Sequence, residues 1–459
     1  MPPLQHILMG NVIGANALDF AGGCGSIANL MKLIAGPSHL QGDVLIPASK
    51  SHTIRAVAIA ALAEGKSIIR NPLYSGDAQA AVNCYRAFGA GIDISNPQAW
   101  RLEGLAGCIQ TPGQTIDVLN SGTTLRIAMG SATLARGGRA TTFTGDHQIQ
   151  TRSVEPLMTA LGDLGARCVS LKGNGCAPVT VAGTLRGGHT SIECRTSQYL
   201  TSLLMCCPLA EGDSEIDVTL LNEPGYVEMT LDWLDRQGIA YRRDGLRHFE
   251  IPGRQRFKGY DAPVPADFSS ATFFLCAGAL FGDGNGVTLR GLDMNDSQPD
   301  KAVVEYLRAM GADVAVGPDE ITVRASELTG AEIDMNATPD ALPAMAVTAA
   351  FARGRTVLGN VPQARYKETD RIACMAAELG KMGVRVEELP DGLVVYGGRP
   401  RAAILDGRYD HRIVMALALA AMGASGGEST IETAEAMAVT FPGFAQLMEG
   451  LGADIRTVE

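Results

Sequence analysis

Six stretches of the chain are apolar at nearly every position, and each of them follows a short polar segment. The apolar stretches are 57–62, 127–134, 200–209, 271–280, 342–351 and 413–422. The polar segments before them are 49–51, 120–123, 196–198, 267–270, 338–340 and 410–412, and they contain the residue types that begin helices. A helix that is apolar on all sides is buried. The pattern therefore predicts six buried helices whose N-termini carry polar side chains.

A second pattern repeats along the chain with the same frequency. After each of six amphipathic helical patterns comes a glycine, and these glycines are spaced by roughly 69 to 76 residues: Gly89, Gly165, Gly238, Gly311, Gly383 and Gly452. Short β-rich stretches such as 67–70, 141–143, 287–289 and 356–358 lie between the helices. We therefore predict an α/β fold of six α+β repeats. The segment 252–265 would separate two lobes of three units, with the site between them.

Composition narrows the class of partner and the compartment. The chain has 459 residues, 46% of them hydrophobic, and a net charge of −11, which argues against nucleic acid and anionic membranes as partners. Ten cysteines without a C-x-x-C pair indicate a reduced, cytoplasmic location. Residues 1–30 contain neither a signal peptide nor a membrane span and are expected to be a disordered extension.

Charged side chains are concentrated where the repeat predicts a loop and a helix N-terminus. Five of the seven residues in 365–371 are ionisable, although charged residues make up only 19% of the chain. Other cations lie in or beside the polar segments: Lys50, Arg55, Arg126, Arg152 and Arg412. Helix N-termini and cations together form anion-binding sites. An anion pocket is the interpretation we favour, and the alternative is a set of ordinary helix caps and surface ion pairs.

Nine short motifs resemble, in sequence order, those of the 5-enolpyruvylshikimate-3-phosphate synthase family. They are S-K-S-H-T-I-R (49–55), L-N-S-G-T-T-L-R (119–126), G-D-H-Q-I-Q-T-R (145–152), T-S-Q-Y-L-T-S-L-L (196–204), D-F-S-S-A (267–271), P-D-A-L-P (339–343), Y-K-E-T-D-R-I (366–372), D-H-R (410–412) and F-P-G-F (441–444). The resemblance spans about residues 31–459. Any one motif would be weak evidence, but nine in order make chance similarity very improbable.

The resemblance implies a two-lobed inside-out α/β barrel of six βαβαββ-type units. One lobe would be residues 31–48 with 267–459, the other 49–266, and the active site would lie in the cleft between them. It also implies transfer of the carboxyvinyl group of phosphoenolpyruvate to the 5-hydroxyl of shikimate 3-phosphate, a step of aromatic amino acid biosynthesis. The enzyme would act as a cytoplasmic monomer without a metal or a cofactor.

The resemblance also assigns substrate-binding residues. Phosphoenolpyruvate would be held by Lys50, Gly122, Arg152, Gln198, Arg371 and Arg412. Shikimate 3-phosphate would be held by Lys50, Ser51, Arg55, Thr196, Ser197, Gln198, Asp340 and Lys367. Because both substrates are multiply charged anions, guanidinium and ammonium groups suit them.

The expected catalytic residues are Asp340, Glu368, Lys50 and His411. Asp340 matches the family's proton acceptor and Glu368 its candidate acid. A carboxylate beside Lys367 and Arg371 normally stays ionised, so Glu368 needs a raised pKa to act as an acid. The alternative role for either carboxylate is that of a helix cap or an ion-pair partner. His52 has no role that the sequence assigns.

Two positions depart from the family pattern. Val439 and Thr440 stand where many members have a lysine that contacts phosphoenolpyruvate, and Glu223 stands near where a serine often precedes the Pro-Tyr segment. Gly122 is the small residue that, by resemblance, leaves room for the inhibitor glyphosate, so sensitivity is expected.

Two other functions remain as alternatives. A sister family transfers the same group to UDP-N-acetylglucosamine, but it uses a loop cysteine, and residues 109–167 contain none. That family also has Lys-Asn where this chain has Lys50 and Ser51. The second alternative is a non-catalytic paralogue that binds a phosphorylated cyclic acid.

Overall fold

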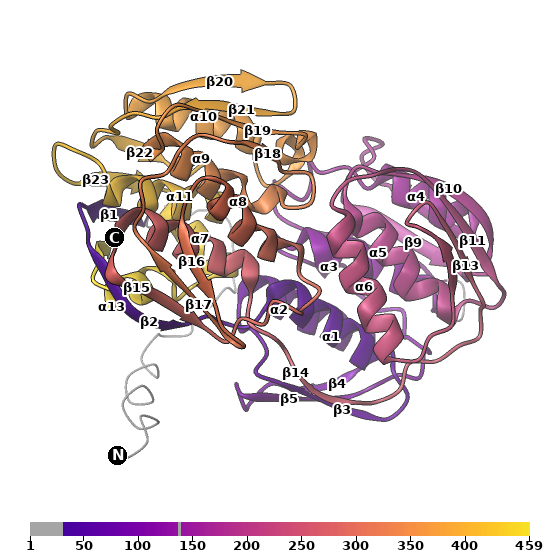
Figure 1. Cartoon of the computed structure of the whole chain (residues 1–459). Coiled ribbons are helices and arrows are strands. Elements are labelled where there is room, and N and C mark those ends of the chain that lie inside the picture. Colours follow the sequence, from indigo (N-terminus) through magenta and orange to yellow (C-terminus); the bar gives the residue numbers. More distant parts are fainter. Residues whose placement is uncertain (1–30, 136–138) are drawn as a thin grey trace, which may run out of the picture.

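The six apolar stretches form buried helices, as predicted. The computed structural model describes residues 31–135 and 139–459, so the predicted extension at 1–30 lies outside the described residues (Figure 1). The buried helices are α1 (Lys50–Leu62), α3 (Gly122–Ala132), α5 (Ser197–Cys206), α7 (Phe268–Phe281), α9 (Leu342–Phe351) and α11 (His411–Met422). Every residue of α11 is buried. The helix predicted at 200–209 ends at Cys206, and a 3-10 turn containing Pro208 completes it, because proline cannot donate the next helical hydrogen bond.

Each buried helix is paired along the chain with an outer helix that ends at one of the six repeated glycines. The outer helices are α2 (Gly76–Ala87), α4 (Glu155–Asp163), α6 (Pro224–Arg236), α8 (Val303–Ala309), α10 (Arg371–Lys381) and α13 (Phe444–Gly450). The six glycines all adopt positive φ, between 67° and 106°. Only glycine enters this region without a steric cost, and it ends a helix by turning the chain there. The repeat seen in the sequence is thus a repeat of helix ends.

The strands form six four-stranded sheets with one topology. In each sheet an outer strand is parallel to its neighbour, and the two remaining pairings are antiparallel, as in β6-β7-β9-β8 and β18-β19-β21-β20. This pattern confirms the prediction of six βαβαββ units. The strands of these two sheets are β6 (Ile116–Asp117), β7 (Thr141–Thr144), β8 (Ala166–Ser170), β9 (Val179–Gly183), β18 (Glu332–Asp334), β19 (Arg355–Gly359), β20 (Arg385–Leu389) and β21 (Gly392–Tyr396).

A third sheet, β10-β11-β13-β12, is also continuous in sequence, whereas the other three combine strands from distant parts of the chain. These are β14-β3-β5-β4, β16-β17-β15-β2 and β22-β23-β1-β24. The strands of the four sheets are β1 (Lys32–Gly36), β2 (Leu40–Leu45), β3 (Lys66–Arg70), β4 (Gly91–Asp93), β5 (Ala99–Glu103), β10 (Gly188–Cys194), β11 (Ser214–Leu221), β12 (Arg242–Asp244), β13 (His248–Ile251), β14 (Asp261–Pro263), β15 (Gly282–Arg290), β16 (Asp313–Val316), β17 (Glu320–Arg324), β22 (Ile404–Asp406), β23 (Ser429–Glu432) and β24 (Asp454–Val458).

The chain therefore begins in one half of the molecule, crosses to the other and returns. Strands β1 and β2 pair with β23, β24 and β15 from the C-terminal part, while β14 returns to pair with β3. Two separate hydrophobic cores result. One contains buried residues from Leu33 to Ile46 and from Phe268 to Ile455, and the other contains buried residues from Ile54 to Val264. Figure 1 shows the two halves side by side, with the indigo start of the chain against the yellow end.

Polar side chains cap the buried helices, as the sequence predicted. Ser49, Ser121, Thr196, Asp267 and Asp410 each accept a hydrogen bond from a backbone N–H in the first turn of the following helix. The sixth helix, α9, instead begins from a 3-10 turn, η4 (Pro339–Ala341), which carries Asp340. Free N–H groups and the positive ends of helix dipoles are thereby placed beside polar side chains.

Candidate functional site

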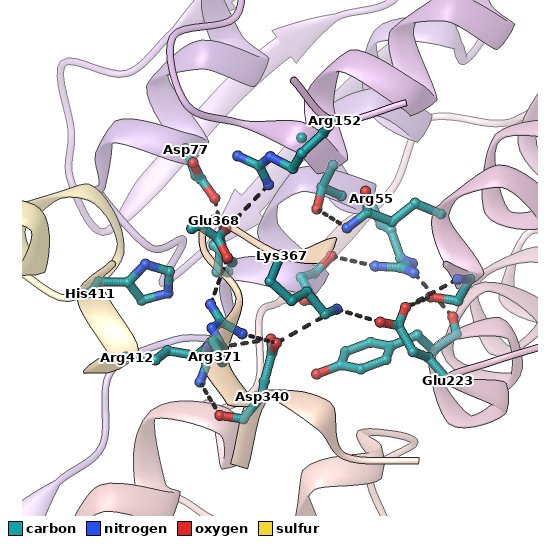
Figure 2. A pocket seen from close by; sticks show the side chains of 17 residues that line it. Arg55, Asp77, Arg152, Glu223, Asp340, Lys367, Glu368, Arg371, His411 and Arg412 are labelled. Carbon is teal, nitrogen blue, oxygen red and sulfur yellow. Dashed lines mark hydrogen bonds and ion pairs between the residues drawn. The ribbon is translucent and has the colours of Figure 1, made fainter. Parts of the chain in front are cut away.

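A pocket lies between the two halves, at the N-termini of the buried helices, and residues from both halves line it. The lining contains most of the cations and carboxylates that the sequence singled out (Figure 2). The lining residues are Lys50, Ser51, Arg55, Asp77, Gly122, Thr123, Arg152, Ser197, Gln198, Glu223, Tyr226, Asp340, Lys367, Glu368, Arg371, His411 and Arg412. Of the residues predicted for the site, only Thr196 is missing from this wall. It lines an adjoining cavity and bonds to Glu223.

Arg371 lies at the start of α10 and connects three carboxylates. Its Nη1 donates to Asp340 Oδ1 at 2.8 Å, its Nη2 to Glu368 Oε2 at 2.6 Å, and its Nε to Asp410 Oδ2 at 2.8 Å. The side chain is 1% exposed. Burial alone would lower the pKa of Arg371, but the charges of Asp410, Glu368 and Asp340 outweigh burial and raise it. The guanidinium is therefore always charged, and its orientation is fixed by three partners.

Asp340 lies within reach of three cations. Besides Arg371, Arg412 Nη2 is 3.0 Å from Oδ2, and Lys367 Nζ is 3.7 Å from Oδ1. Burial would raise the pKa of Asp340, but the positive charges of Arg412, Lys367 and Arg371 prevail and hold it well below 3.8. The carboxylate is thus ionised at neutral pH and available to accept a proton.

Glu368 is ionised as well, contrary to what an acid requires. Burial would raise its pKa, yet the charges of Arg371 and Arg152 hold the pKa well below 4.5. Arg152 Nη1 lies 3.4 Å from Glu368 Oε1, across the boundary between the two halves. Glu368 can serve as an acid only after a bound ligand has become the partner of these guanidinium groups, because only then would the pKa of Glu368 rise.

Arg55 is a buried cation that no carboxylate neutralises among the described residues. It is 2% exposed and donates only to neutral oxygens, those of Thr230, Thr201, Ser51 and Tyr226. Burial lowers the pKa of Arg55 to about 10, so the guanidinium is still charged at neutral pH. An uncompensated buried charge is unfavourable, and an anion in the pocket would compensate it.

His411 and two arginines of the pocket wall carry buried polar atoms without a hydrogen-bond partner among the described residues. Burial, and then the charge of Arg412, hold the pKa of His411 well below 6.5, so the imidazole is neutral. Its Nε2 has no hydrogen-bond partner among the described residues, nor do Nε of Arg152 and Nε of Arg412. Buried polar groups normally have partners. These atoms therefore mark positions where a ligand would bond.

Four pocket residues were not predicted for the site: Asp77, Thr123, Glu223 and Tyr226. Asp77 lies in the first turn of α2 and pairs with Lys50, with Oδ2 3.1 Å from Nζ. The Tyr226 hydroxyl donates to Asp300 Oδ2 at 2.6 Å across the two halves. Asp77 and Tyr226 lie on outer helices, where an acidic first turn or a tyrosine is ordinary, so nothing in their local sequence separated them from surface residues.

The departures from the family pattern have different structural consequences. Val439 lies in α12 (Met437–Thr440), and its backbone packs against Gly76 without reaching the pocket wall. Glu223, in contrast, is a pocket residue that bonds to Ser197 and Lys367. His52, which had no assigned role, is fully buried: its Nδ1 accepts from Trp233 Nε1 at 2.9 Å, and its Nε2 lies 3.3 Å from Asp296 Oδ1.

Two further findings concern metals and membranes. Within 31–135 and 139–459, no group of three or more histidine, cysteine or acidic side chains is arranged to hold a metal ion. Among the described helices, none combines the length and the apolar character that crossing a membrane requires.

Comparisons with known proteins agree on one family. The family model described as EPSP synthase (3-phosphoshikimate 1-carboxyvinyltransferase) matches residues 34–448. The 3-phosphoshikimate 1-carboxyvinyltransferase of Ruminiclostridium cellulolyticum is 48% identical over 421 residues, which is 92% of this chain and 98% of that protein. The enzyme of the same name from Acetivibrio thermocellus is 49% identical over 429 residues, covering 94% and 100%. A solved structure of EPSP synthase from Acinetobacter baumannii superposes with a TM-score of 0.78 at 26% identity, covering 94% and 100%.

Proposed function

The chain belongs to the EPSP synthase family, and we propose that its central pocket carries out the family reaction with the residues described above. It is an enzyme that transfers the carboxyvinyl group of phosphoenolpyruvate to the 5-hydroxyl of shikimate 3-phosphate and releases phosphate. The observation that supports this assignment of residues most directly is the gathering of Lys50, Arg55, Arg152, Arg371 and Arg412 in one pocket. Cations gathered from both halves of an acidic chain into one pocket favour a site for anionic ligands.

Phosphoenolpyruvate occupies the part of the pocket next to Arg152, Arg371 and Arg412. These guanidinium groups lie around Glu368 and Asp340, and Nε of both Arg152 and Arg412 is unpaired. Gly122 has no side chain, so the substrate can come close to the backbone there. The positive end of the dipole of α3 lies at the same place. The carboxylate and the phosphate of the substrate replace the internal carboxylates as partners of the guanidinium groups.

Shikimate 3-phosphate occupies the part next to α1 and α5. Arg55, Ser51 and Gln198 line that side, and Lys367 reaches it from the other half. Gln198 is oriented by two bonds: its Oε1 accepts from Arg126 at 3.1 Å, and its Nε2 donates to Thr123 at 3.1 Å. Lys50, at the N-terminus of α1, is positioned to contact both substrates.

The reaction is an addition followed by an elimination. Asp340 accepts the proton of the 5-hydroxyl as that oxygen attacks the central carbon of phosphoenolpyruvate, while the methylene carbon receives a proton. The tetrahedral adduct then loses a proton from the new methyl group and expels phosphate. Glu368, once its cations bind the substrate, is the group best placed to deliver and remove the proton at carbon, with Lys50 and His411 next to it.

The proposed function also includes the two lobes of the molecule and their movement. The two lobes are residues 31–48 with 267–459 and residues 49–266, each with its own core. The lobes close on the substrates, because the bound anions bridge cations of both halves such as Arg152 and Arg371. The enzyme works as a monomer. Its compartment is the cytoplasm, and nine free cysteines among the described residues agree with a reducing environment.

Phosphate release from phosphoenolpyruvate tests the function. The purified chain should release phosphate with shikimate 3-phosphate as acceptor and not with UDP-N-acetylglucosamine. The product should carry the enolpyruvyl group at the 5-oxygen by mass spectrometry and NMR. Release with UDP-N-acetylglucosamine alone would indicate the sister activity, and binding of shikimate 3-phosphate without turnover would indicate a non-catalytic paralogue.

A further inference from the structure

Glu223 places a carboxylate among the groups expected to bind the acceptor. Its Oε2 accepts from Ser197 Oγ at 2.7 Å, from Ser197 N at 3.1 Å and from Thr196 Oγ1 at 3.1 Å. Its Oε1 pairs with the ammonium of Lys367. The residue is 1% exposed and lies on the pocket wall (Figure 2). Thr196, Ser197 and Lys367 are three of the residues assigned to shikimate 3-phosphate.

This set of donors is a typical phosphate site. It combines two hydroxyls, a backbone N–H at the N-terminus of the ten-residue helix α5 and the ammonium of Lys367, whose side chain is 15% exposed. The carboxylate satisfies each of these donors as a phosphate group would. Glu223 is held there by an unusual backbone, with φ 61° and ψ 47°, a conformation that costs energy for a residue with a side chain. The backbone N–H of Glu223 donates to Oδ1 of Asn336 at 3.4 Å. Because Asn336 belongs to the other half of the molecule, both halves hold the backbone turn at Glu223.

We propose that Glu223 is an internal anion that occupies the position of the acceptor's phosphate and thereby lowers the enzyme's preference for phosphorylated acceptors. This inference rests on the proposed function. The phosphate of shikimate 3-phosphate carries close to two negative charges at neutral pH. It cannot share Ser197 and Lys367 with an ionised carboxylate, so Glu223 must leave before the acceptor binds.

The structure provides a place for the displaced side chain. The adjoining cavity is also lined by Glu223, Thr196 and Lys367, and two arginines, Arg126 and Arg195, are among its other lining residues. Rotation about the side-chain bonds of Glu223 moves its carboxylate from the donors of α5 towards these cations. Every acceptor that carries a phosphate therefore has to displace an ion pair. An acceptor without a phosphate leaves Glu223 in place, and its donors remain satisfied.

Because Glu223 competes only with acceptors that carry a phosphate, its presence weakens the enzyme's discrimination between shikimate 3-phosphate and shikimate. Removing the charge of Glu223 frees Ser197, Thr196 and Lys367 for the phosphate. We expect Glu223→Gln, which preserves size, and Glu223→Ser, which shortens the side chain and supplies a hydroxyl, to lower the KM for shikimate 3-phosphate by about tenfold or more, since a charge in contact is removed. The KM for phosphoenolpyruvate should change less than twofold. The ratio of kcat/KM for shikimate 3-phosphate to that for shikimate should rise by the same factor.

The control is Glu228→Gln, an equivalent loss of charge on the same helix at a side chain that is 45% exposed and pairs with Arg243. Calorimetric titration of each protein with shikimate 3-phosphate gives the affinity independently of turnover. An unchanged or raised KM and dissociation constant for shikimate 3-phosphate in both Glu223 variants would overturn the inference and leave Glu223 as a structural ion-pair partner. Failure of the wild type to release phosphate with shikimate 3-phosphate would instead contradict the proposed function.

Discussion

Arg371 donates from Nη1 to Oδ1 of Asp340 at 2.8 Å, and this bond joins the start of α10 to the turn before α9. The same guanidinium bonds Glu368 and the fully buried Asp410. One side chain therefore orients both proposed proton-transfer groups and the residue that caps α11. Its position explains why the charges of 365–371 lie together in the sequence.

Replacing Arg371 with lysine should cost both stability and activity. An ammonium keeps the charge but cannot bond three carboxylates in fork geometry, so Asp410 loses its buried partner. We expect the free energy of unfolding in guanidinium chloride to fall by roughly 3 kcal/mol, and kcat/KM for phosphoenolpyruvate to fall at least about a hundredfold. Arg385→Lys, at a side chain 69% exposed, is the control. Wild-type stability in Arg371→Lys would show that the three-carboxylate contact is unimportant.

Replacing Asp340 with asparagine should separate chemistry from binding. The amide has the same shape but cannot accept the proton of the 5-hydroxyl, so kcat should fall by about 10² to 10⁴. Shikimate 3-phosphate should bind as well as before or better, because Arg412, Arg371 and Lys367 lose a competing carboxylate. Steady-state kinetics and calorimetry measure the two effects. Asp313→Asn, at an aspartate 59% exposed, should behave as wild type. Turnover near the wild-type rate would remove Asp340 from the mechanism.

The sequence predicted the architecture and most of the pocket because both depend on local patterns. Apolar runs such as 413–422 are buried in any packing of this chain, and a glycine that follows an amphipathic helical pattern, such as Gly383, ends the helix by adopting positive φ. Arg412 was identified because it lies at a predicted helix start, and Asp340 because its motif resembles that of a known family. The protonation state of Glu368 could not be predicted, since it depends on how close Arg152 comes from the other half of the molecule. Asp77 and Tyr226 join the pocket only through the packing of the outer helices.

Replacing Gly122 with alanine should reduce sensitivity to glyphosate. A Cβ there would lie 2.6 Å from Arg126 Nη1 and 3.0 Å from Arg152 Nη1, so at least one guanidinium would have to shift into the space beside phosphoenolpyruvate. The wild type should be inhibited, and the variant should need about tenfold more glyphosate for half inhibition at a fixed phosphoenolpyruvate concentration, with a smaller rise in the KM for phosphoenolpyruvate. Gly113→Ala, where a Cβ meets open space, is the control. Equal inhibition of Gly122→Ala and wild type would place glyphosate elsewhere.

Asp300 should make the protein less stable as the pH rises towards neutrality. Burial, and then the negative charge of Asp340, raise the pKa of Asp300 from 3.8 to about 7, while the Tyr226 hydroxyl donates to it. Between about pH 4 and pH 7 the folded protein retains a proton that the unfolded chain has lost, so the free energy of unfolding falls as pH rises through this window. The loss is at most about 4 kcal/mol.

Asp300→Asn removes this titration while it preserves an oxygen for Tyr226 to donate to. The variant should therefore gain stability relative to the wild type as the pH is raised from 5 to about 8, and the gain should level off above the pKa of about 7. Denaturant unfolding at several pH values measures the difference, with the exposed Asp244→Asn as control. A difference in the free energy of unfolding that stays constant across these pH values would mean that Asp300 has the same pKa in the folded and unfolded states. The cross-lobe bond to Tyr226 would then join a hydroxyl to an ionised carboxylate throughout the pH range.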